Sequence, residues 1–279
     1  MEKILSKNEI FYSTLFVRNK GYISPEIQLL IKNTPVLIAG CGIGSTVAET
    51  LIRMGCENIT LVDKDEVSLH NLNRQVFQQA HIGKKKVDSL KQHLLSINPN
   101  AKINAIPAYI NENNVENIIK DSKFIFDTID FLDLKGLLAL HDCARKHQIP
   151  VASSLAIGWG CGSLVFNQNS MSFRELFQIP ESNGIEYSYK EVFSKFLENI
   201  ACQLDETVLS VVAQALTIME DGKPCPASQV SPGASSVGAL SGYLFFKSLC
   251  NEELPLAPQM IYLDFNELIQ NSLLNTIGA

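Results

Sequence analysis

Residues 36–45 read VLIAGCGIGS, an apolar run followed by three closely spaced glycines and then by a segment of helical periodicity. The apolar run predicts a buried strand, and Gly40, Gly42 and Gly44 would let the backbone turn tightly and approach a phosphate. The N–H groups and the dipole of the following helix favour negative charge. The stretch therefore predicts a nucleotide-binding turn. The alternative is that the glycines only allow the helix to pack closely on the strand.

The same alternation of strand and helix continues along the chain. Short β-branched runs alternate with helical segments long enough to be crossovers, which predicts a doubly wound α/β fold with a mainly parallel Rossmann-like sheet and helices on both faces. The expected strands are 36–39, 59–62, 102–106, 124–126, 151–153, 163–167 and 260–264, and the expected helices are 45–54, 84–97, 113–120, 132–146, 204–220 and 234–249. We expect a helical N-terminal arm at 1–33 and one nucleotide-binding adenylation domain at 34–279, with a loop-rich and helical insertion at about 168–222.

Composition excludes several classes of protein. The 279 residues include 46% hydrophobic residues, and 23 Lys plus Arg against 29 Asp plus Glu give a net charge of −6. This indicates a globular chain with no general attraction to nucleic acid or anionic membranes. Two charge-free stretches, 149–173 and 224–246, contain too many Gly, Ser or Pro residues to predict membrane spans, and the N-terminus has no signal-peptide core. We expect a cytoplasmic protein without a membrane or nucleic-acid partner.

Charged and polar residues follow the second expected strand. Asp63 stands 19 positions after Gly44, where a carboxylate can accept hydrogen bonds from ribose hydroxyls. The chain lacks the G-x-x-x-x-G-K-[ST] motif, so other cations must neutralise nucleotide phosphates, and Arg and Lys side chains suit that task. The candidates in this block are Asp63, Asp65, Asn71, Asn73, Arg74, Gln75, Lys84, Lys85 and Lys86. A strand-end cap is the alternative for Asp63, and a solvated helix face is the alternative for the lysines.

Together these motifs resemble the adenylyltransferase family that includes ThiF, MoeB and the ubiquitin-activating enzymes. The resemblance covers roughly residues 10–265 and rests on the glycine turn, Asp63-Lys-Asp65, Asn71-Leu-Asn73-Arg74-Gln75, Gly83 with Lys86, and Asp127-Thr-Ile-Asp130. It implies binding of ATP and Mg²⁺, attack of a carboxylate on the α-phosphate, and formation of an acyl-adenylate with release of pyrophosphate. By the same resemblance Asp63 would hold the ribose, Asn71, Arg74 and Lys86 would surround the phosphates, and Asp130 would help to place Mg²⁺.

The chemistry of Asp130 agrees with that role. It follows the apolar run FIFD, so it stands at the carboxyl end of an expected strand, where open α/β sheets bind ligands. A carboxylate oxygen is also the kind of ligand that Mg²⁺ prefers. The alternative is that Asp130 caps the helix expected to begin near Leu132.

The N-terminal segment FVRNKGYISPEIQLL, residues 16–30, resembles the arm that precedes the core in this family. By that resemblance Arg18 enters a nucleotide site, commonly that of a dimer partner, and Gln28 matches a glutamine of the arm. A homodimer is therefore expected. A solvent-facing arginine is the alternative for Arg18.

Seven cysteines include no C-x-x-C pair, so we expect a reduced chain. Many relatives hold a structural zinc with two such pairs, and because this chain has none we expect no zinc site. By resemblance Cys225, which precedes a small-residue helix, is the best candidate for an acyl acceptor, with Cys202 a weaker one. A thiol can serve if a nearby cation such as Lys223 lowers its pKa. The alternative is an unreactive cysteine. Trp159 and Cys161 are expected to lie in the core.

The leading hypothesis is an enzyme that adenylates the C-terminal carboxylate of a ubiquitin-like or sulfur-carrier protein or of a small peptide. A modified tRNA base is another possible acyl substrate. One alternative is an NAD-dependent oxidoreductase, for which Asp63 is suitable but Arg74, Lys86 and Asp130 have no role. Another is a catalytically inactive nucleotide-binding dimer scaffold, which would require a broken active site.

Overall fold

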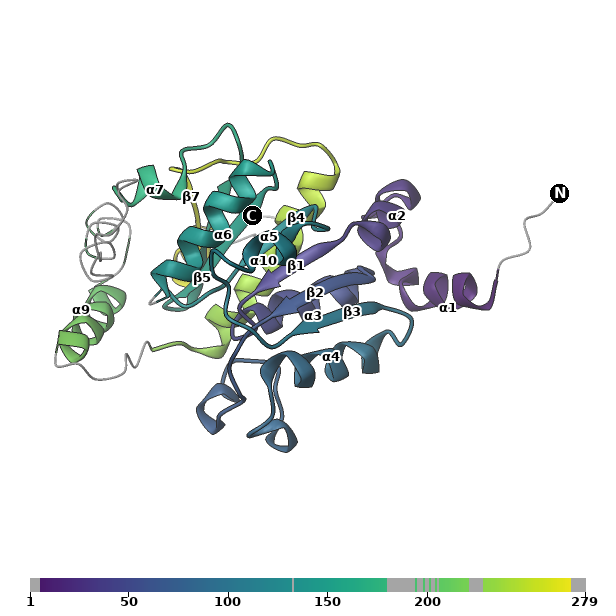
Figure 1. Ribbon diagram of the computed structural model, residues 1–279, viewed down its shortest axis with the longest axis horizontal. Coiled ribbons are helices and arrows are strands. Elements are labelled where there is room, and N and C mark those ends of the chain that lie inside the picture. Colours follow the sequence, from purple (N-terminus) through teal and green to yellow (C-terminus); the bar gives the residue numbers. More distant parts are fainter. Residues whose placement is uncertain are drawn as a thin grey trace, which may run out of the picture.

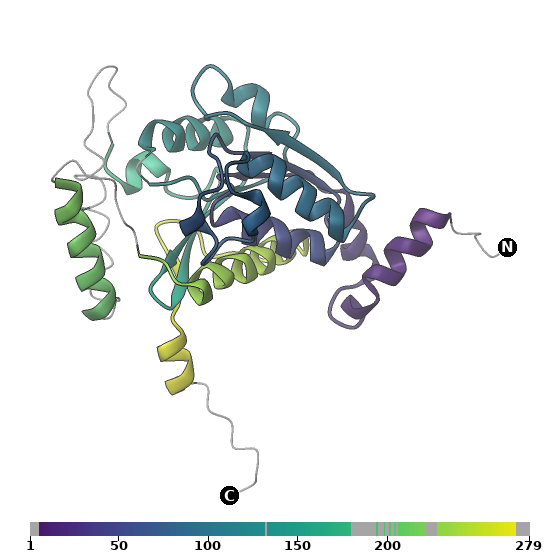
Figure 2. The same ribbon diagram turned by 90° about the horizontal axis from the view of Figure 1, so that it is seen from below.

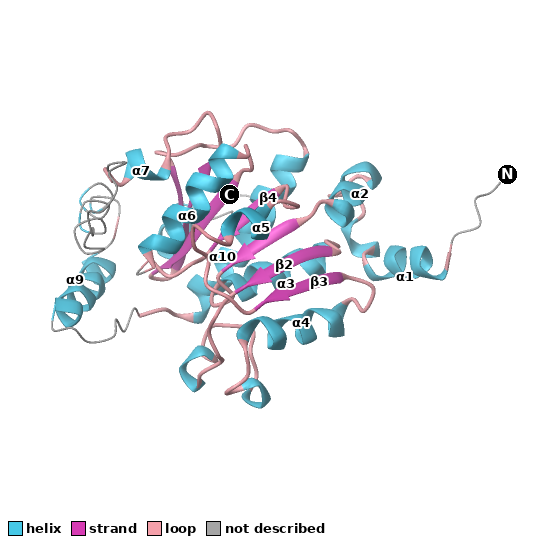
Figure 3. Cartoon of the chain, viewed as in Figure 1, coloured by secondary structure: helices cyan, strands magenta, loops and turns pink. Residues whose placement is uncertain are grey.

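The computed structural model describes residues 6–131, 133–179, 206–220 and 228–271, together with positions 194, 198, 201 and 204. One sheet carries seven strands in the order β3-β2-β1-β4-β5-β6-β7 (Figures 1 and 3). The first five strands pair in parallel, and the last two pair antiparallel. The strands are β1 (Val36–Ala39), β2 (Asn58–Val62), β3 (Lys102–Ile106), β4 (Phe124–Asp127), β5 (Val151–Ile157), β6 (Gly160–Phe166) and β7 (Met260–Leu263). The predicted doubly wound α/β fold is confirmed.

Helices cover both faces of this sheet, as Figure 2 shows for α6 and α10 on opposite sides. The helices are α1 (Lys7–Leu15), α2 (Pro25–Asn33), α3 (Gly44–Met54), α4 (Lys86–Ile97), α5 (Val115–Ile119), α6 (Leu134–Lys146), α7 (Phe173–Leu176), α9 (Glu206–Glu220), α10 (Ser231–Leu249) and α11 (Phe265–Asn271). Because side chains alternate along a strand, Leu37 of β1 joins the core beneath α5 and α6, and Ile38 joins the core beneath α3, α4 and α10.

Most expected elements agree with these bounds to within two or three residues, and the differences have local causes. Helix α6 begins at Leu134 because the Asp133 side chain accepts a hydrogen bond from Gly136 N (3.0 Å) and caps the helix. Strand β5 extends to Ile157 because it pairs along its whole length with β6. The expectation for Trp159 was wrong, since its side chain is half exposed at the turn between these two strands, whereas Cys161 is buried as expected.

Helix α10 explains part of the second charge-free stretch. Gly238 and Gly242 lie against α3, and a Cβ atom at Gly238 would stand 2.6 Å from Thr46 O. Small residues are therefore needed for close packing of two helices. No helix within the described ranges has both the length and the apolar character needed to cross a membrane.

The N-terminal arm, formed by α1, α2 and the intervening 3₁₀ turn η1 (Val17–Asn19), docks on the carboxyl end of α3. Tyr12 Oη donates to Gly55 O (2.7 Å). Asn19 Nδ2 and Gln28 Nε2 donate to Met54 O at 3.2 and 2.9 Å. These donors satisfy carbonyl groups that a helix end leaves without partners.

Candidate active site

The glycine turn joins β1 to α3 and packs against the residue that follows β4. Gly40 has a φ of +90°, and a Cβ atom there would lie 2.5 Å from Thr128 O. A Cβ atom at Gly44 would lie 2.4 Å from Thr128 Oγ1 and 2.8 Å from Ile38 Cγ2. Thr128 Oγ1 donates to Gly40 O (2.7 Å). Gly40 therefore allows the backbone conformation of the turn. Gly44 allows α3 to pack closely on Thr128 and Ile38, as the close-packing alternative proposes.

Asp63 is fixed beside this turn by backbone donors. Its Oδ2 accepts from Cys41 N and its Oδ1 from Asp65 N, each at 2.7 Å. Asp63 remains half-buried. Each carboxylate oxygen has a second lone pair, so the group can also accept hydrogen bonds from a ribose. The buried Cys41 thiol stays protonated, because burial raises its pKa well above the usual value.

Lys86 reaches the same point from the start of α4. Its side-chain Nζ lies 3.0 Å from Asp65 Oδ2, and its backbone N–H donates to Asp65 O (2.9 Å). The side chain is only 10% exposed, whereas that of Lys85 is 44% exposed and pairs with Glu66 (3.1 Å). Lys84 is also exposed. The solvated-face alternative therefore describes Lys84 and Lys85, and Lys86 is the buried cation of the three.

Residues 71–75 are connected to the glycine turn by Gln75 and by the next residue, Val76. Val76 N donates to Ser45 Oγ (3.2 Å), and the Gln75 side chain lies beside Gly42. Gln75 Oε1 is buried and has no hydrogen-bond partner among the described residues. Asn71 is also buried, and its Oδ1 accepts from Ser68 N (2.9 Å). Asn71 thus shapes the loop, while Gln75 offers an unused acceptor at the turn.

Arg74 is half-buried and held by several acceptors. Its Nη1 donates to His70 O (3.0 Å) and to Asn73 Oδ1 (2.9 Å), and its Nε contacts Gln229 Oε1. Asn73 Nδ2 donates to Gln229 O (3.1 Å). Burial lowers the pKa of Arg74, but a guanidinium keeps its charge. Sequence reasoning missed Gln229, because 155 positions separate it from Arg74 and no local pattern links them.

The two aspartates after β4 have different surroundings. Asp127 is buried, and its Oδ2 contacts His141 Nε2 (2.9 Å) and accepts from Ser153 Oγ (2.7 Å). Asp130 is exposed in the loop that Thr128 begins beside the glycine turn. Because Asp133 caps α6, the capping alternative for Asp130 does not hold. Asp127 supports the loop from within, and Asp130 presents a carboxylate at its surface.

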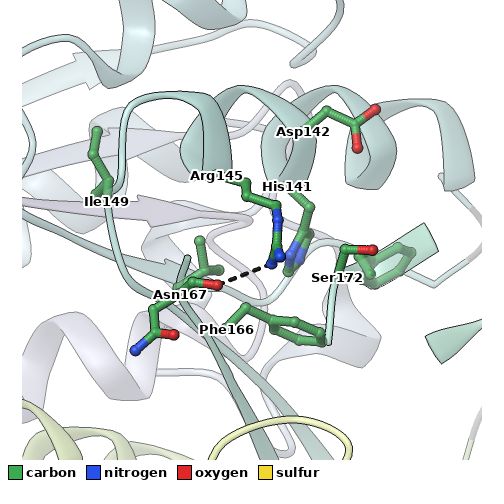
Figure 4. Close-up of a pocket in the computed structure, with 9 residues that line it drawn as sticks. His141, Asp142, Arg145, Ile149, Phe166, Asn167 and Ser172 are labelled. Carbon is green, nitrogen blue, oxygen red and sulfur yellow. Dashed lines mark hydrogen bonds between the residues drawn. The ribbon is translucent and has the colours of Figure 1, made fainter. Parts of the chain in front are cut away.

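A small pocket between α6, the end of β6 and α7 is not part of this site. It has a volume of about 20 Å³ and is bordered by His141, Arg145, Phe166 and Phe173 (Figure 4). Arg145 Nη1 closes one side by donating to Asn167 O (3.0 Å), the dashed line in Figure 4. Such a volume suits about one water molecule. The pocket cannot hold a nucleotide or an acyl substrate.

Of the other predicted residues, Arg18 is described by the structure and is not brought to the glycine turn. Arg18 is exposed in the arm, whose next residue, Asn19, contacts Met54 at the far end of α3. A helix of 11 residues is about 16 Å long, so Arg18 is separated from the turn by that length of helix. Cys225 and Cys202, as well as the neighbouring Lys223, lie outside the described residues.

The residues present suit a magnesium nucleotide. The glycine turn opens α3, whose N-terminal dipole favours an anion. Asp63, Lys86 and Gln75 Oε1, which has no partner in the described part of the chain, lie around this turn. Asp130 offers an oxygen ligand of the type that Mg²⁺ takes. The set therefore combines an acceptor suited to hydroxyl groups, cations of the kind that bind phosphates, and one candidate metal ligand.

The sequence is similar to those of several known proteins. The ThiF family profile matches residues 16–274. Adenylyltransferase and sulfurtransferase MOCS3 of Drosophila virilis is 35% identical over 47% of this chain and 29% of its own length. The tRNA threonylcarbamoyladenosine dehydratase of Bacillus subtilis is 34% identical over 50% of this chain and 56% of its own length. The molybdopterin-synthase adenylyltransferase of Haemophilus influenzae is 30% identical over 63% of this chain and 73% of its own length.

Solved structures show the same fold at lower identity. PaaA is 20% identical with a TM-score of 0.66, covering 96% of this chain and 83% of PaaA. Escherichia coli MccB with ATP is 20% identical with a TM-score of 0.60, covering 85% of this chain and 62% of MccB. Escherichia coli TcdA in complex with ATP is 17% identical with a TM-score of 0.61, covering 89% of this chain and 98% of TcdA. The family profile, which spans nearly the whole chain, establishes that this protein belongs to the ThiF family.

Proposed function

We propose that this protein uses ATP and Mg²⁺ to adenylate a carboxylate, giving an acyl-adenylate and pyrophosphate. The observation that carries the proposal is the linked set at the glycine turn, in which Asp63 is anchored by two backbone N–H groups and Lys86 is buried against Asp65. An NAD-dependent oxidoreductase would need Asp63 but would give no role to Lys86 or Arg74. The names of relatives that include adenylyltransferases, and the ATP complexes of MccB and TcdA, support the same choice.

The reaction requires two anions to meet. A substrate carboxylate oxygen bonds to the α-phosphorus while the bond from that phosphorus to the bridging oxygen breaks, and the electron pair leaves with pyrophosphate. Asp63 would hold the ribose hydroxyls, and Lys86, Arg74 and the N-terminus of α3 would bind the phosphates. Mg²⁺, held with the help of Asp130, would neutralise phosphate charge when bound. The residues of the chain therefore position the substrates and offset their negative charge.

The proposed acyl substrate is the C-terminus of a ubiquitin-like or sulfur-carrier protein or of a small peptide. The Haemophilus influenzae relative is named for molybdopterin synthase, which favours a protein substrate. The Bacillus subtilis relative is named for a modified tRNA base, so tRNA is the second candidate. The net charge of −6 gives no general attraction to tRNA and favours the first.

A homodimer would complete the proposal. The arm exposes apolar side chains, with exposed fractions of 90% for Tyr22, 58% for Leu29 and 52% for Ile10. Such a surface is typical of a contact with another protein. Because Arg18 is separated from its own glycine turn by the length of α3, it can reach a nucleotide only in a second copy. Sedimentation equilibrium should give the mass of a dimer, and Leu29→Glu should shift it toward a monomer.

The acceptor after adenylation separates two versions of the enzyme. In one, the Cys225 thiolate attacks the acyl carbonyl, AMP leaves, and a thioester forms. In the other, which we favour, the acceptor is an external nucleophile. Cys225→Ala should keep pyrophosphate exchange in both versions, and it should abolish a reductant-sensitive adduct with the substrate only in the first.

The test of the proposed function is carboxylate-dependent exchange of labelled pyrophosphate into ATP, with sulfur-carrier proteins, small peptides and modified tRNA as candidate acyl substrates. Asp130→Asn should abolish exchange, because Asn lacks the charge that would hold Mg²⁺. Asp133→Asn is the matched control, since Asn caps helices as well as Asp does. Calorimetry that shows binding of NAD in preference to magnesium ATP would contradict the proposal.

A further inference from the structure

A second group of reactive side chains lies at the far end of α6, where α5 packs against it. Glu116 comes from α5, Cys143 lies in the last turn of α6, and His147 is the residue that ends this helix. One donor atom from each of the three lies within 4.8 Å of the other two. Among the described residues this is the group of His, Cys, Asp and Glu side chains that converges in this way.

The backbone holds the three side chains in register. Cys143 and His147 are four positions apart, and His147 N donates to Cys143 O (3.1 Å), so both side chains leave the same face of the helix. Glu116 lies between Val115 and Ile119, two near neighbours in α5 that are buried in the core cluster shared with α6. The cluster is therefore held by two packed helices rather than by a loose loop.

The distances are close to those of a metal site. Zinc binds sulfur at about 2.3 Å and nitrogen or oxygen at about 2.0–2.2 Å, which places tetrahedral ligand atoms about 3.4–3.6 Å from one another. Cys143 Sγ already lies 3.5 Å from Glu116 Oε2. His147 Nε2 lies 2.6 Å from Glu116 Oε1, a hydrogen-bond distance that must open by about 1 Å for both to bind one ion. Both of these side chains are partly exposed, at 37% and 53%, so a small rotation suffices.

We propose that Glu116, Cys143 and His147 bind one Zn²⁺ ion, with water as the fourth ligand. Thiolate, imidazole and carboxylate together form a donor set typical of zinc and of similar divalent ions. On binding, the Cys143 thiol releases its proton to solvent as the metal–sulfur bond forms. The site stands at the opposite end of α6 from Asp130 and Asp133, so it would brace α5 against α6 and take no part in adenylation. The site does not depend on the proposed function, and it departs from the expectation of no zinc, which considered only paired cysteines.

One cation competes with the metal. Lys146 Nζ lies 3.3 Å from Glu116 Oε2, and its side chain is 68% exposed. A long exposed lysine can move into solvent at little cost, because surface ion pairs contribute little. Removing the Lys146 charge should therefore strengthen Zn²⁺ binding, whereas removing one of the three proposed ligands should weaken it.

The experiment uses the full chain, stripped of metal by chelation and kept reduced, and titrated with Co²⁺ as a spectroscopic substitute for Zn²⁺. Wild-type protein should develop the charge-transfer absorption of a cobalt–thiolate bond, and added Zn²⁺ should displace it. Cys143→Ser should abolish the band. Cys250→Ser, at the end of α10, is the matched control and should keep it. Lys146→Met should bind Zn²⁺ more tightly than wild type.

Loss of one of the other two donors should weaken Zn²⁺ binding by at least about tenfold, since even residues that only support metal ligands contribute about that much. His147→Ala and Glu116→Gln test this at exposed positions, so the proposal stays testable if Cys143→Ser fails to fold. A wild-type chain without the cobalt–thiolate band, or a folded Cys143→Ser variant that retains it, would overturn the site.

Discussion

The two ends of α3 are built in opposite ways. At the carboxyl end, Tyr12, Asn19 and Gln28 of the arm donate hydrogen bonds to the carbonyl groups of Met54 and Gly55. At the amino end, the capping position is held by Ile43, which makes no side-chain cap, and the nearby polar side chains are arranged around the glycine turn. One end is closed by the protein itself. The other keeps the features that favour an anionic ligand.

Because of this difference, we expect residues at one end of α3 to affect stability and residues at the other end to affect the proposed catalysis. Substitutions at the arm end should change the free energy of unfolding and leave ATP chemistry intact, because their contacts are made within the chain. Substitutions of charged residues at the glycine-turn end should do the reverse, because those residues would act on a bound nucleotide.

Among the substitutions that compare the two ends of α3, Arg74→Ala at the amino end should have the largest effect on catalysis. Loss of a charge-stabilising donor should reduce transition-state stabilisation by about 2–4 kcal/mol, measured as the rate of pyrophosphate exchange. The matched control is Arg53→Ala at the carboxyl end of α3, where the exposed Arg53 side chain pairs through Nε with Glu49 (2.8 Å), one turn earlier in the same helix. Equal rates for the two variants would remove Arg74 from the site.

Glycine substitutions compare backbone strain at the two ends. Gly40 and Gly21 both have a positive φ, +90° and +95°, but only Gly40 faces a close neighbour, Thr128 O. Gly21→Ala should cost about 1–2 kcal/mol of unfolding free energy from its backbone conformation. Gly40→Ala should cost about 1–3 kcal/mol more, because the turn must shift. Urea unfolding measures both, and equal losses would show that Thr128 does not confine the turn.

Alkaline pH should weaken the arm end through Cys56, which follows Gly55. Burial raises the pKa of this thiol from 9.0 to about 12. The folded chain then keeps a proton that the unfolded chain loses, so this contribution is fully present below pH 9 and falls as pH rises toward 12. The slope from this one thiol should be about 1.4 kcal/mol per pH unit. Urea unfolding above pH 9 should show a smaller slope for Cys56→Ala, and an unchanged slope would contradict the assignment.

The smallest expected effect is that of Tyr12→Phe. It removes the hydroxyl that donates to Gly55 O and accepts from Gln28 Nε2 (2.9 Å), and this should lower the unfolding free energy by about 1 kcal/mol. Tyr22→Phe, at a side chain of the same arm that is 90% exposed, should leave the stability of the monomer unchanged. If Tyr12→Phe lowered the rate of pyrophosphate exchange together with stability, the two ends of α3 would not have separate roles.

Local patterns were sufficient to predict the parallel sheet and its crossovers. A buried strand, a glycine turn and an amphipathic helix each leave a signal within about 15 residues, and Asp63 follows at a spacing that one βαβ unit imposes. The same patterns predicted β6 and β7, but not their antiparallel pairing, because a strand's direction depends on the path of the chain between strands.

Contacts between segments that are distant in the sequence could not be predicted from local patterns. Local spacing identified Arg74 and the lysines as candidates, but only packing placed Lys86 against Asp65, brought Gln229 to Arg74 and left Lys85 in solvent. Likewise, Cys143 and His147 share a visible helical spacing, whereas Glu116 joins them from another helix. Periodicity records which face a residue occupies along its own element. Which faces then meet is decided by how the elements pack together, since burial of apolar surface is non-directional and does not specify which apolar face meets which.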